Sequence, residues 1–343
     1  MKRLLTVLLM VTLCLSGCGT TAELPPEQKQ YTATFLTLFD TVTTILGRSH
    51  SKESFQETAQ TLHDQLLEYH QLFDIYNTYE GMANLKTVND AAGVAPVEVD
   101  ERIIRLLLDC KDFYEATGGK VNAAMGSVLQ LWHEKRSAGR DDPVNAQLPD
   151  WDDLVQAAAH TDFDAVVIDP NASTVHITDP DVQLDVGAIA KGWSLQQVVE
   201  TAPAGLLISV GGNVCATGPK DENGTPWVVG IQGVEGGEDY LHTIYVKDGC
   251  VVTSGDYQRT YMVDGKLYHH IIDPETLYPS QYWRSVTVVC QDSGTADALS
   301  TALFLLPLEQ GQALLERYQA RAVWLNAAGE LFYSPGFQDL IRT

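Results

Sequence analysis

The chain has 343 residues, of which 45% are hydrophobic and 20% are charged. This composition is typical of a folded protein with a large buried core, and it excludes a disordered chain, a coiled coil and a disulfide-stapled miniprotein. The formal net charge of −23 repels phosphate backbones, so nucleic acid is not an expected partner. A small phosphate-bearing ligand stays open if a metal ion or a helix N-terminus supplies local positive potential.

The N-terminus has the pattern of an export signal. An apolar run over residues 4–13 follows two cations, and it is too short to span a bilayer permanently. Leu15-Ser16-Gly17-Cys18 resembles a bacterial lipobox, which implies cleavage before Cys18 and lipidation of its thiol; the alternative is a plain secretory signal with a chance cysteine. We therefore predict a lipoprotein signal peptide over residues 1–17, a polar tether over 18–30, and a lipid-anchored protein on the extracytoplasmic face of the cell membrane.

The first half of the mature chain alternates strands and helices. Residues 31–47 are rich in β-branched and aromatic types and predict strands broken near Asp40. Apolar residues spaced by three and four from Phe55 to Phe73 form one stripe and predict a long helix. A second helix is expected from an Asp100 N-cap to Gly118-Gly119. Beyond it, the segment 138–149 predicts a loop and a candidate subdomain boundary, and the following helix is predicted over 151–159.

The second half is rich in strands. Three helices interrupt the series, over 189–201, 296–305 and 308–319, and a hairpin closes the chain near residue 328. Strands are predicted over 165–169, 174–178, 182–186, 206–210, 227–232, 242–247, 251–253, 259–263, 268–272 and 285–290. The pattern predicts an α+β fold, in which a mainly antiparallel sheet packs against segregated helices, with residues 31–343 as a single domain.

Two segments combine strands with small residues. In Leu184-Asp185-Val186-Gly187-Ala188-Ile189-Ala190-Lys191-Gly192-Trp193, a strand passes through a small-residue turn into a helix, where a ligand could approach backbone amides and Lys191 could face a phosphate. A mere packing junction is the alternative. Ser209-Val210-Gly211-Gly212-Asn213 could also allow a close backbone approach to a ligand, although a tight hairpin turn explains it equally well.

Two further segments carry polar side chains. His269 and His270 lie in a predicted strand, where neighbouring side chains face opposite sides, so at most one serves a given site as a base. A structural histidine is the alternative. Asp297 and Thr301 are four residues apart in a helix expected to be capped by Thr295, and they present oxygen ligands of the kind that Mg²⁺ prefers. Alternatively, Asp297 only offsets the helix dipole.

Taken in order, these segments resemble the ApbE family of FAD:protein FMN transferases over residues 35–335. Residues 185–192 are similar to its D-x-G-x-I-A-K-G segment, 211–213 to its G-G-[DN], 270–274 to its H-I-I-D-P and 297–301 to its D-x-x-x-T. Phe39-Asp40-Thr41 stands where the family usually has Met-Gly-Thr. The resemblance implies an ApbE-like architecture related to the T-fold.

The resemblance also implies site residues. The carbonyl of Ala188, the carboxylate of Asp297 and the hydroxyl of Thr301 would hold Mg²⁺ against the FAD pyrophosphate, with Asp297 and His270 as the catalytic residues. The flavin nucleotide would contact a further set of residues: Phe39, Tyr79, Asn122, Asp185, Lys191, His270 and Ile271. Asn122 departs from the Asp of many relatives, which removes a charge near the cofactor, and Phe39 replaces Met.

The family's activity is transfer of FMN from FAD to a Thr or Ser hydroxyl of a partner protein, with release of AMP. We expect His270 to take the proton of that hydroxyl, because an unperturbed imidazole is half deprotonated near neutral pH. The expected acceptor is a flavin subunit of a membrane redox complex or another extracytoplasmic flavinylated protein. The alternatives are a Mg²⁺-dependent FAD pyrophosphatase, a non-catalytic FAD-binding lipoprotein and a partner-binding scaffold without flavin.

Overall fold

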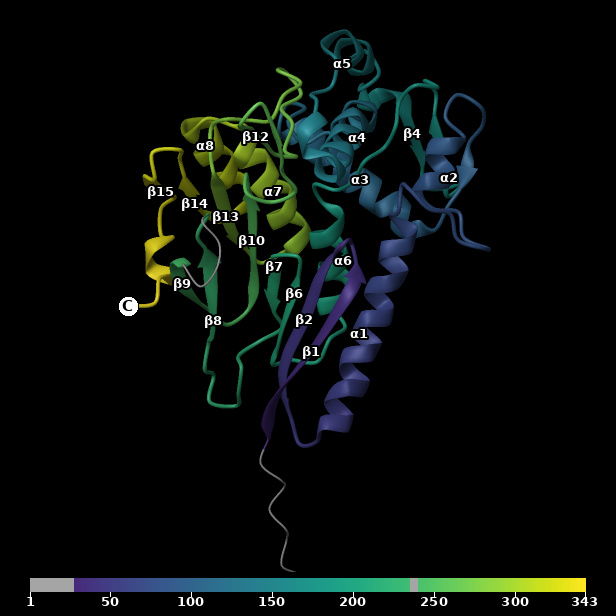
Figure 1. Ribbon diagram of the computed structural model, residues 1–343. Coiled ribbons are helices and arrows are strands. Elements are labelled where there is room, and N and C mark those ends of the chain that lie inside the picture. Colours follow the sequence, from purple (N-terminus) through teal and green to yellow (C-terminus); the bar gives the residue numbers. More distant parts are fainter. Residues whose placement is uncertain (1–27, 235–239) are drawn as a thin grey trace, which may run out of the picture.

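The computed structural model describes residues 28–234 and 240–343 (Figure 1). The predicted signal peptide, Cys18 and the predicted tether as far as residue 27 lie outside these ranges. The last two residues of the predicted tether, 29 and 30, already belong to the first strand. In the described part of the chain, no helix combines the length and the apolar character that a membrane crossing needs.

An eight-stranded sheet, antiparallel throughout, forms the centre of the molecule (Figure 1). Its strands, in spatial order, are β1 (Lys29–Leu38), β2 (Thr41–Ser49), β6 (Leu206–Val210), β7 (Asn213–Ala216), β10 (Gly249–Gly255), β13 (Ser285–Cys290), β14 (Arg321–Leu325) and β15 (Leu331–Tyr333). The predicted break near Asp40 is the turn between β1 and β2. The predicted mainly antiparallel α+β class is confirmed.

Helices cover one face of this sheet, and a β-hairpin covers the other. The helices α1 (Lys52–Leu72), α6 (Ala190–Val199) and α7 (Ser293–Leu305) pack on the first face, and α8 (Leu308–Tyr318) packs beside α7. On the second face, β8 (Trp227–Gln232) pairs with β9 (Tyr240–Val246). Because side chains alternate along a strand, Cys250 packs among the residues facing α1 while Val251 packs against the hairpin.

Helix α1 follows the predicted apolar stripe. Phe55, Ala59, Leu62 and Leu66 are buried, and the side chain of Ser51 accepts a hydrogen bond from the Ser54 N–H to cap the helix. Figure 1 shows α1 running beside β1 and β2, with which it makes direct contacts. The apolar stripe of α1 therefore packs against the edge of the sheet formed by β1 and β2.

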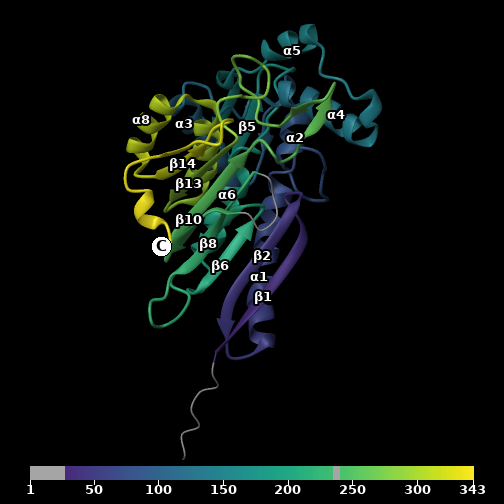
Figure 2. The same ribbon diagram turned by 60° about the vertical axis from the view of Figure 1, so that its left-hand side comes forward.

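A smaller, mainly helical part stands beyond one end of the sheet (Figure 2). The predicted helices are confirmed as α3 (Glu101–Ala116), capped by Asp100, and α5 (Trp151–Ala158). The sequence patterns had not indicated α4 (Gly126–Asp141), which extends into the predicted loop over 138–149. This part also contains α2 (Leu85–Asp90), a sheet of β3 (Val97–Glu98), β5 (Thr174–Ile177) and β4 (Val166–Asp169), and a hairpin of β11 (Tyr261–Val263) and β12 (Lys266–Tyr268). Short 3-10 helices lie at Pro143–Asn145, Phe163–Ala165 and, near the C-terminus, Gln338–Leu340.

Three local predictions were wrong. Residues 182–186 form no regular strand, and only Gln183 makes an isolated bridge, to Met125. The strand predicted over 268–272 ends at Tyr268, because the backbone beyond it pairs with residues 279–280: the Ser280 N–H donates to the Ile271 carbonyl, and Ile272 makes an isolated bridge with Pro279. Helix α7 begins at Ser293 rather than after Thr295, since the Asp292 side chain accepts the hydrogen bond from the Thr295 N–H.

Candidate active site

A cleft of about 380 Å³ lies between the helical part and the sheet. Its walls come from the β1–β2 turn, α4, the start of α6, β10 and α7, and the segments on either side of the β11–β12 hairpin. This volume lies within the range of small-molecule sites. Segments separated by up to about 260 residues of chain thus meet in one hollow, and most of the predicted site residues line it.

The carboxylate of Asp297 is held where α6 meets α7. Its residue is only 4% exposed, and its Oδ2 accepts hydrogen bonds from the Gly192 N–H (2.9 Å) and from Lys191 Nζ (3.4 Å). A Cβ on Gly192 would stand 2.2 Å from the Ser293 carbonyl oxygen and 2.5 Å from the Asp297 Cβ. The absence of a side chain at position 192 therefore brings the two helices close enough for this contact.

The oxygen donors around Asp297 suit a hard divalent cation. Among the described residues, the Oδ1 of Asp297 accepts no hydrogen bond, so one oxygen of a nearly buried carboxylate is free for another ligand. Ala188, which has a backbone carbonyl, and Thr301, which has a side-chain hydroxyl, line the same cleft. Carboxylate, carbonyl and hydroxyl oxygens are the ligand types that Mg²⁺ takes, so these residues fit the predicted metal.

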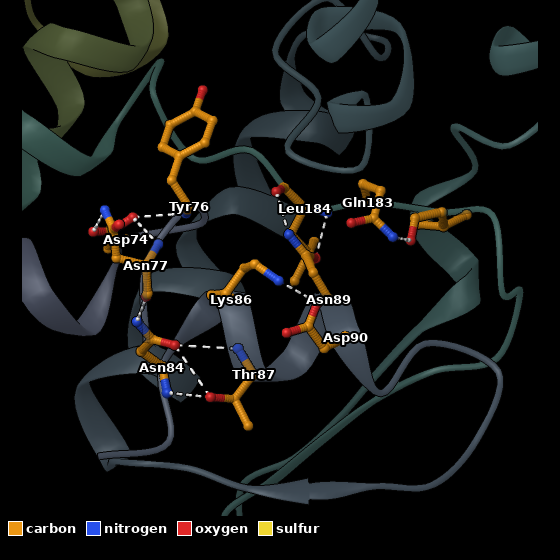
Figure 3. A network of polar contacts seen from close by, with 11 residues as sticks. Asp74, Tyr76, Asn77, Asn84, Lys86, Thr87, Asn89, Asp90, Gln183 and Leu184 are labelled. Atoms are coloured by element: carbon orange, nitrogen blue, oxygen red, sulfur yellow. Dashed lines mark hydrogen bonds and ion pairs between the residues drawn. The ribbon is translucent and has the colours of Figure 1, made fainter. Parts of the chain in front are cut away.

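Asp185 lies in a loop that a buried amide holds in place. Its Oδ1 accepts a hydrogen bond from the Gly187 N–H (2.8 Å). One residue earlier, the side chain of Asn89 accepts from the Leu184 N–H (2.8 Å) and donates to the Leu184 carbonyl (3.0 Å), as Figure 3 shows. Asn89 is thus a positioning residue that the sequence analysis missed, because its partner is 95 residues away.

His270 is a neutral base in this structure. Its Nδ1 lies 3.2 Å from the Gln258 carbonyl oxygen, which can only accept, so Nδ1 carries the proton and Nε2 keeps its lone pair. Burial lowers the pKa of His270 from 6.5 to about 3, helped by the positive charges of Arg259 and Arg136. The expectation of a half-protonated imidazole near neutral pH was therefore wrong. Ile271, which is buried, follows it along the cleft wall.

Two predicted cofactor residues lie outside the lining of the cleft. Phe39 adopts a left-handed φ of 52°, packs its ring edge-on against His70, and donates its N–H to His70 Nδ1 (3.3 Å). Tyr79 donates its hydroxyl hydrogen to Asp74 Oδ2 (2.7 Å). The cleft is lined instead by Tyr76, whose N–H donates to Asp74 (Figure 3). The carboxylate of Asp74 therefore holds the Tyr79 hydroxyl away from the cleft, while Tyr76, in the same turn, lines it.

Asn122 lines the cleft, and both ends of its amide are engaged. Its Oδ1 accepts from the Ala124 N–H (2.8 Å), and its Nδ2 donates to the Thr161 carbonyl (2.8 Å). An ionised aspartate could make the first of these contacts but not the second. The hydrogen bond to the Thr161 carbonyl is therefore one that an amide can form at this position and a carboxylate cannot.

Three cations in the cleft were also missed. Lys120 lies 2.9 Å from Asp273 and 3.0 Å from Glu275, so it is neutralised locally. Arg136 and Arg259 come from α4 and from the segment before β11. The only available signal was their charge, because nothing in the local sequence around either arginine resembles a binding motif.

Comparisons with known proteins place the chain in a family. The model of the ApbE family matches residues 39–324. A Treponema pallidum protein named FAD:protein FMN transferase is 35% identical over 277 residues, which cover 75% of each chain. A Klebsiella pneumoniae protein of the same name is 30% identical over 290 residues, which cover 79% of this chain and 86% of that one. The crystal structure of the ApbE protein from Thermotoga maritima superposes with a TM-score of 0.80 at 29% identity, covering 92% of this chain and 100% of that one. The resemblance drawn from the motifs is confirmed, and this chain belongs to the ApbE family.

Proposed function

We propose that this protein transfers FMN from FAD to a Ser or Thr hydroxyl of a partner protein and releases AMP, with Mg²⁺ bound at the cleft. The observation that carries the proposal is the meeting, in one cleft, of the oxygen donors around Asp297 with the neutral imidazole of His270. Two relatives of 30% identity or more bear the name of this activity. Asp185, Lys191, Asn122, His270 and Ile271 line the cleft where the flavin nucleotide would bind.

The reaction is a substitution at phosphorus. The acceptor oxygen forms a bond to the flavin-side phosphorus, the anhydride bond to the other phosphate breaks, and AMP leaves with the electron pair. Ala188, Asp297 and Thr301 would hold Mg²⁺, which supplies Lewis acidity toward the pyrophosphate oxygens. Lys191 adds a positive charge beside Asp297, which offsets charge that develops on the phosphates.

His270 would take the proton of the attacking hydroxyl. Its Nδ1–H is committed to the Gln258 carbonyl, so Nε2 is the atom that accepts the proton. A neutral imidazole is ready for this role across the physiological pH range, although its low pKa makes it a weak base in the free enzyme. The negative charge of bound FAD would raise that pKa and strengthen the base.

The N-terminal signal and Cys18 suggest where the acceptor is met. We propose that the mature protein is anchored by lipid on the extracytoplasmic side of the cell membrane. An acceptor subunit of a membrane redox complex, or another extracytoplasmic flavinylated protein, would then share the same surface. Confinement of both partners to one surface raises their effective concentration without any further contact.

The proposal is tested by incubating the mature protein with FAD, Mg²⁺ and candidate acceptor proteins and then weighing the acceptor. A mass increase equal to FMN minus water supports transfer. Free FMN and AMP with an unmodified acceptor would show an FAD pyrophosphatase instead. Unchanged FAD that stays bound would show a binding protein, and the absence of bound flavin would favour a scaffold. Metabolic labelling of the wild type and of Cys18→Ala with a fatty acid tests the anchor.

A further inference from the structure

Arg136 and Arg259 place two guanidinium groups in the cleft of a strongly acidic protein. The whole chain has a formal net charge of −23. Both arginines line the cleft, together with Lys191. Because long-range repulsion from the rest of the protein opposes the entry of an anion, local cations must dominate the potential where an anion binds.

Arg136 is held from within its own helix. One of its terminal nitrogens lies 2.9 Å from His133 Nδ1, one turn earlier on α4, and the ring of His133 packs at 5.3 Å from the ring of Tyr76. A guanidinium can only donate, so His133 Nδ1 accepts. This contact occupies one terminal nitrogen and orients the planar group, which has five donor hydrogens in all.

Arg259 lines the same cleft from a distant part of the chain, the segment just before β11. Its backbone has a left-handed φ of 47°, and a terminal nitrogen donates to the Phe39 carbonyl at 3.3 Å in the β1–β2 turn. Its residue is exposed, so the guanidinium stands where the cleft meets solvent. The turn between β1 and β2 thereby helps to fix the position of the Arg259 guanidinium.

Neither arginine forms a direct ion pair with a carboxylate of the described residues, and Asp185, which lines the same cleft, acts favourably on the charge of Arg136 without contacting it. In residues 28–234 and 240–343, no Asp or Glu forms an ion pair with either group, whereas Lys120 and Lys191 both have one. The pKa of Arg136 is lowered by burial and by the nearby charge of Arg259, so the two groups act on each other repulsively. Two oriented guanidinium groups that repel each other form a place where an anion relieves the repulsion.

We infer that Arg136 and Arg259 form a phosphate subsite of the cleft, separate from the oxygen donors around Asp297, which binds a phosphate of the nucleotide substrate. The inference rests on the proposed function, because it assigns a role within the same cleft. Phosphate oxygens match the planar donor set of arginine, which binds such groups through two parallel hydrogen bonds. The phosphate can belong to the AMP half or to the FMN half of FAD.

The test measures the binding of AMP and of FMN, separately, by isothermal titration calorimetry in EDTA and low salt. The variants are Arg136→Gln, Arg259→Gln and their combination. Loss of one charge-assisted hydrogen-bonding partner is expected to weaken binding by roughly 10-fold or more per arginine. If AMP binding weakens, the subsite holds the adenosine-side phosphate; if FMN binding weakens, it holds the flavin-side phosphate.

Arg140→Gln is the matched control, since Arg140 lies one turn further along α4, is exposed and does not line the cleft. It removes the same charge and should leave both affinities unchanged. Arg136→Lys keeps the charge without the planar group and should weaken binding by an intermediate amount. Thermal unfolding followed by circular dichroism shows that each variant is folded.

The inference is overturned if the double variant binds both AMP and FMN within twofold of the wild type, or if the wild type binds neither nucleotide. Transfer of FMN is measured on the same proteins. If the wild type modifies its acceptor and the arginine variants bind both nucleotides as tightly as the wild type does, the subsite alone is contradicted. If the wild type modifies no acceptor, but the arginine variants bind AMP or FMN more weakly than the wild type does, the proposed function alone is contradicted.

Discussion

The cleft contains two groups of charged side chains that are arranged in opposite ways. Around Asp297, the carboxylate is buried and paired with Lys191 and with a backbone N–H of α6. Arg136 and Arg259 both line the cleft, and neither forms an ion pair with a carboxylate of the described residues. The carboxylate of the first group has an ion-pair partner within the protein, whereas the two arginines of the second group have none in the described part of the chain until an anion binds. Substitutions should therefore affect the two groups differently.

The largest effect is expected at Asp297. Asp297→Ala removes the nearly buried carboxylate among the oxygen donors, so acceptor modification should fall by more than the roughly 10²–10⁴-fold expected from loss of a general base. Mass spectrometry of the acceptor over time measures this rate. Asp297→Asn, which keeps the shape of the side chain, should be nearly as inactive. A rate of one tenth of the wild-type value in either variant would contradict the assignment.

His270→Asn should lower the transfer rate by roughly 10²–10⁴-fold, because it removes the group that takes the proton of the attacking hydroxyl. In the wild type, the pKa of His270 is about 3, so kcat/KM should stay level as the pH falls from 8 to 5 and decline only below that range. An acid limb centred near pH 6.5 would show that His270 is not the desolvated base described here. His269→Asn is the control, because that ring contacts the Ser280 carbonyl and does not line the cleft.

The two groups also differ in how far the sequence could reveal them. Asp185, Ala188 and Lys191 lie within one short segment, and Asp297 and Thr301 lie on one turn of helix, so local spacing was enough to associate them with a ligand. Arg136 and Arg259 are 123 positions apart, and Arg136 sits in a helix whose mostly polar sequence predicted a loop at its end. Only the tertiary fold brings these two together.

For the fold as well, the sequence revealed features with local signals and missed those that depend on distant contacts. The apolar stripe of α1 and the Asp100 cap of α3 are local signals, and both were predicted at the right place. Residues 182–186 looked like a strand because Val182, Leu184 and Val186 alternate with polar residues. Their burial comes instead from packing into the main core, and Asn89 takes the hydrogen bonds of Leu184 that a neighbouring strand would have made. A partner 95 residues away leaves no local trace.

Gly192→Ala tests whether the close approach of α6 and α7 maintains the Asp297 group. The new Cβ would meet the backbone oxygen of Ser293, so one helix must shift, at a cost of about 1–3 kcal/mol in the free energy of unfolding. Denaturant unfolding measures the cost, and the acceptor assay should show reduced transfer. Gly294→Ala, whose Cβ would come no closer than 3.2 Å to the Trp193 backbone, should cost less. Equal costs would argue against this packing.

Asn122→Asp tests whether a charge or a hydrogen bond matters near the cleft. The substitution removes the bond to the Thr161 carbonyl and faces that oxygen with a carboxylate, which should lower the free energy of unfolding by about 1–3 kcal/mol. Asn122→Ala provides the comparison without a new charge. FAD affinity, measured by calorimetry, should change less than stability. A variant that is as stable as the wild type and binds FAD more tightly would show that the missing charge was the important feature.

The smallest effect, and the sharpest contrast with Asp297, concerns the stability of the free protein. Arg136→Gln removes one of two like charges, so the free energy of unfolding should stay within about 0.5 kcal/mol of the wild type or rise. A double-mutant cycle with Arg259→Gln isolates the interaction between the two groups. If the two arginines repel each other, each substitution changes the free energy of unfolding more favourably when the other arginine is present than when it has already been replaced. The opposite sign would mean that the arginines support each other in the free protein, and the contrast with the paired group around Asp297 would no longer hold.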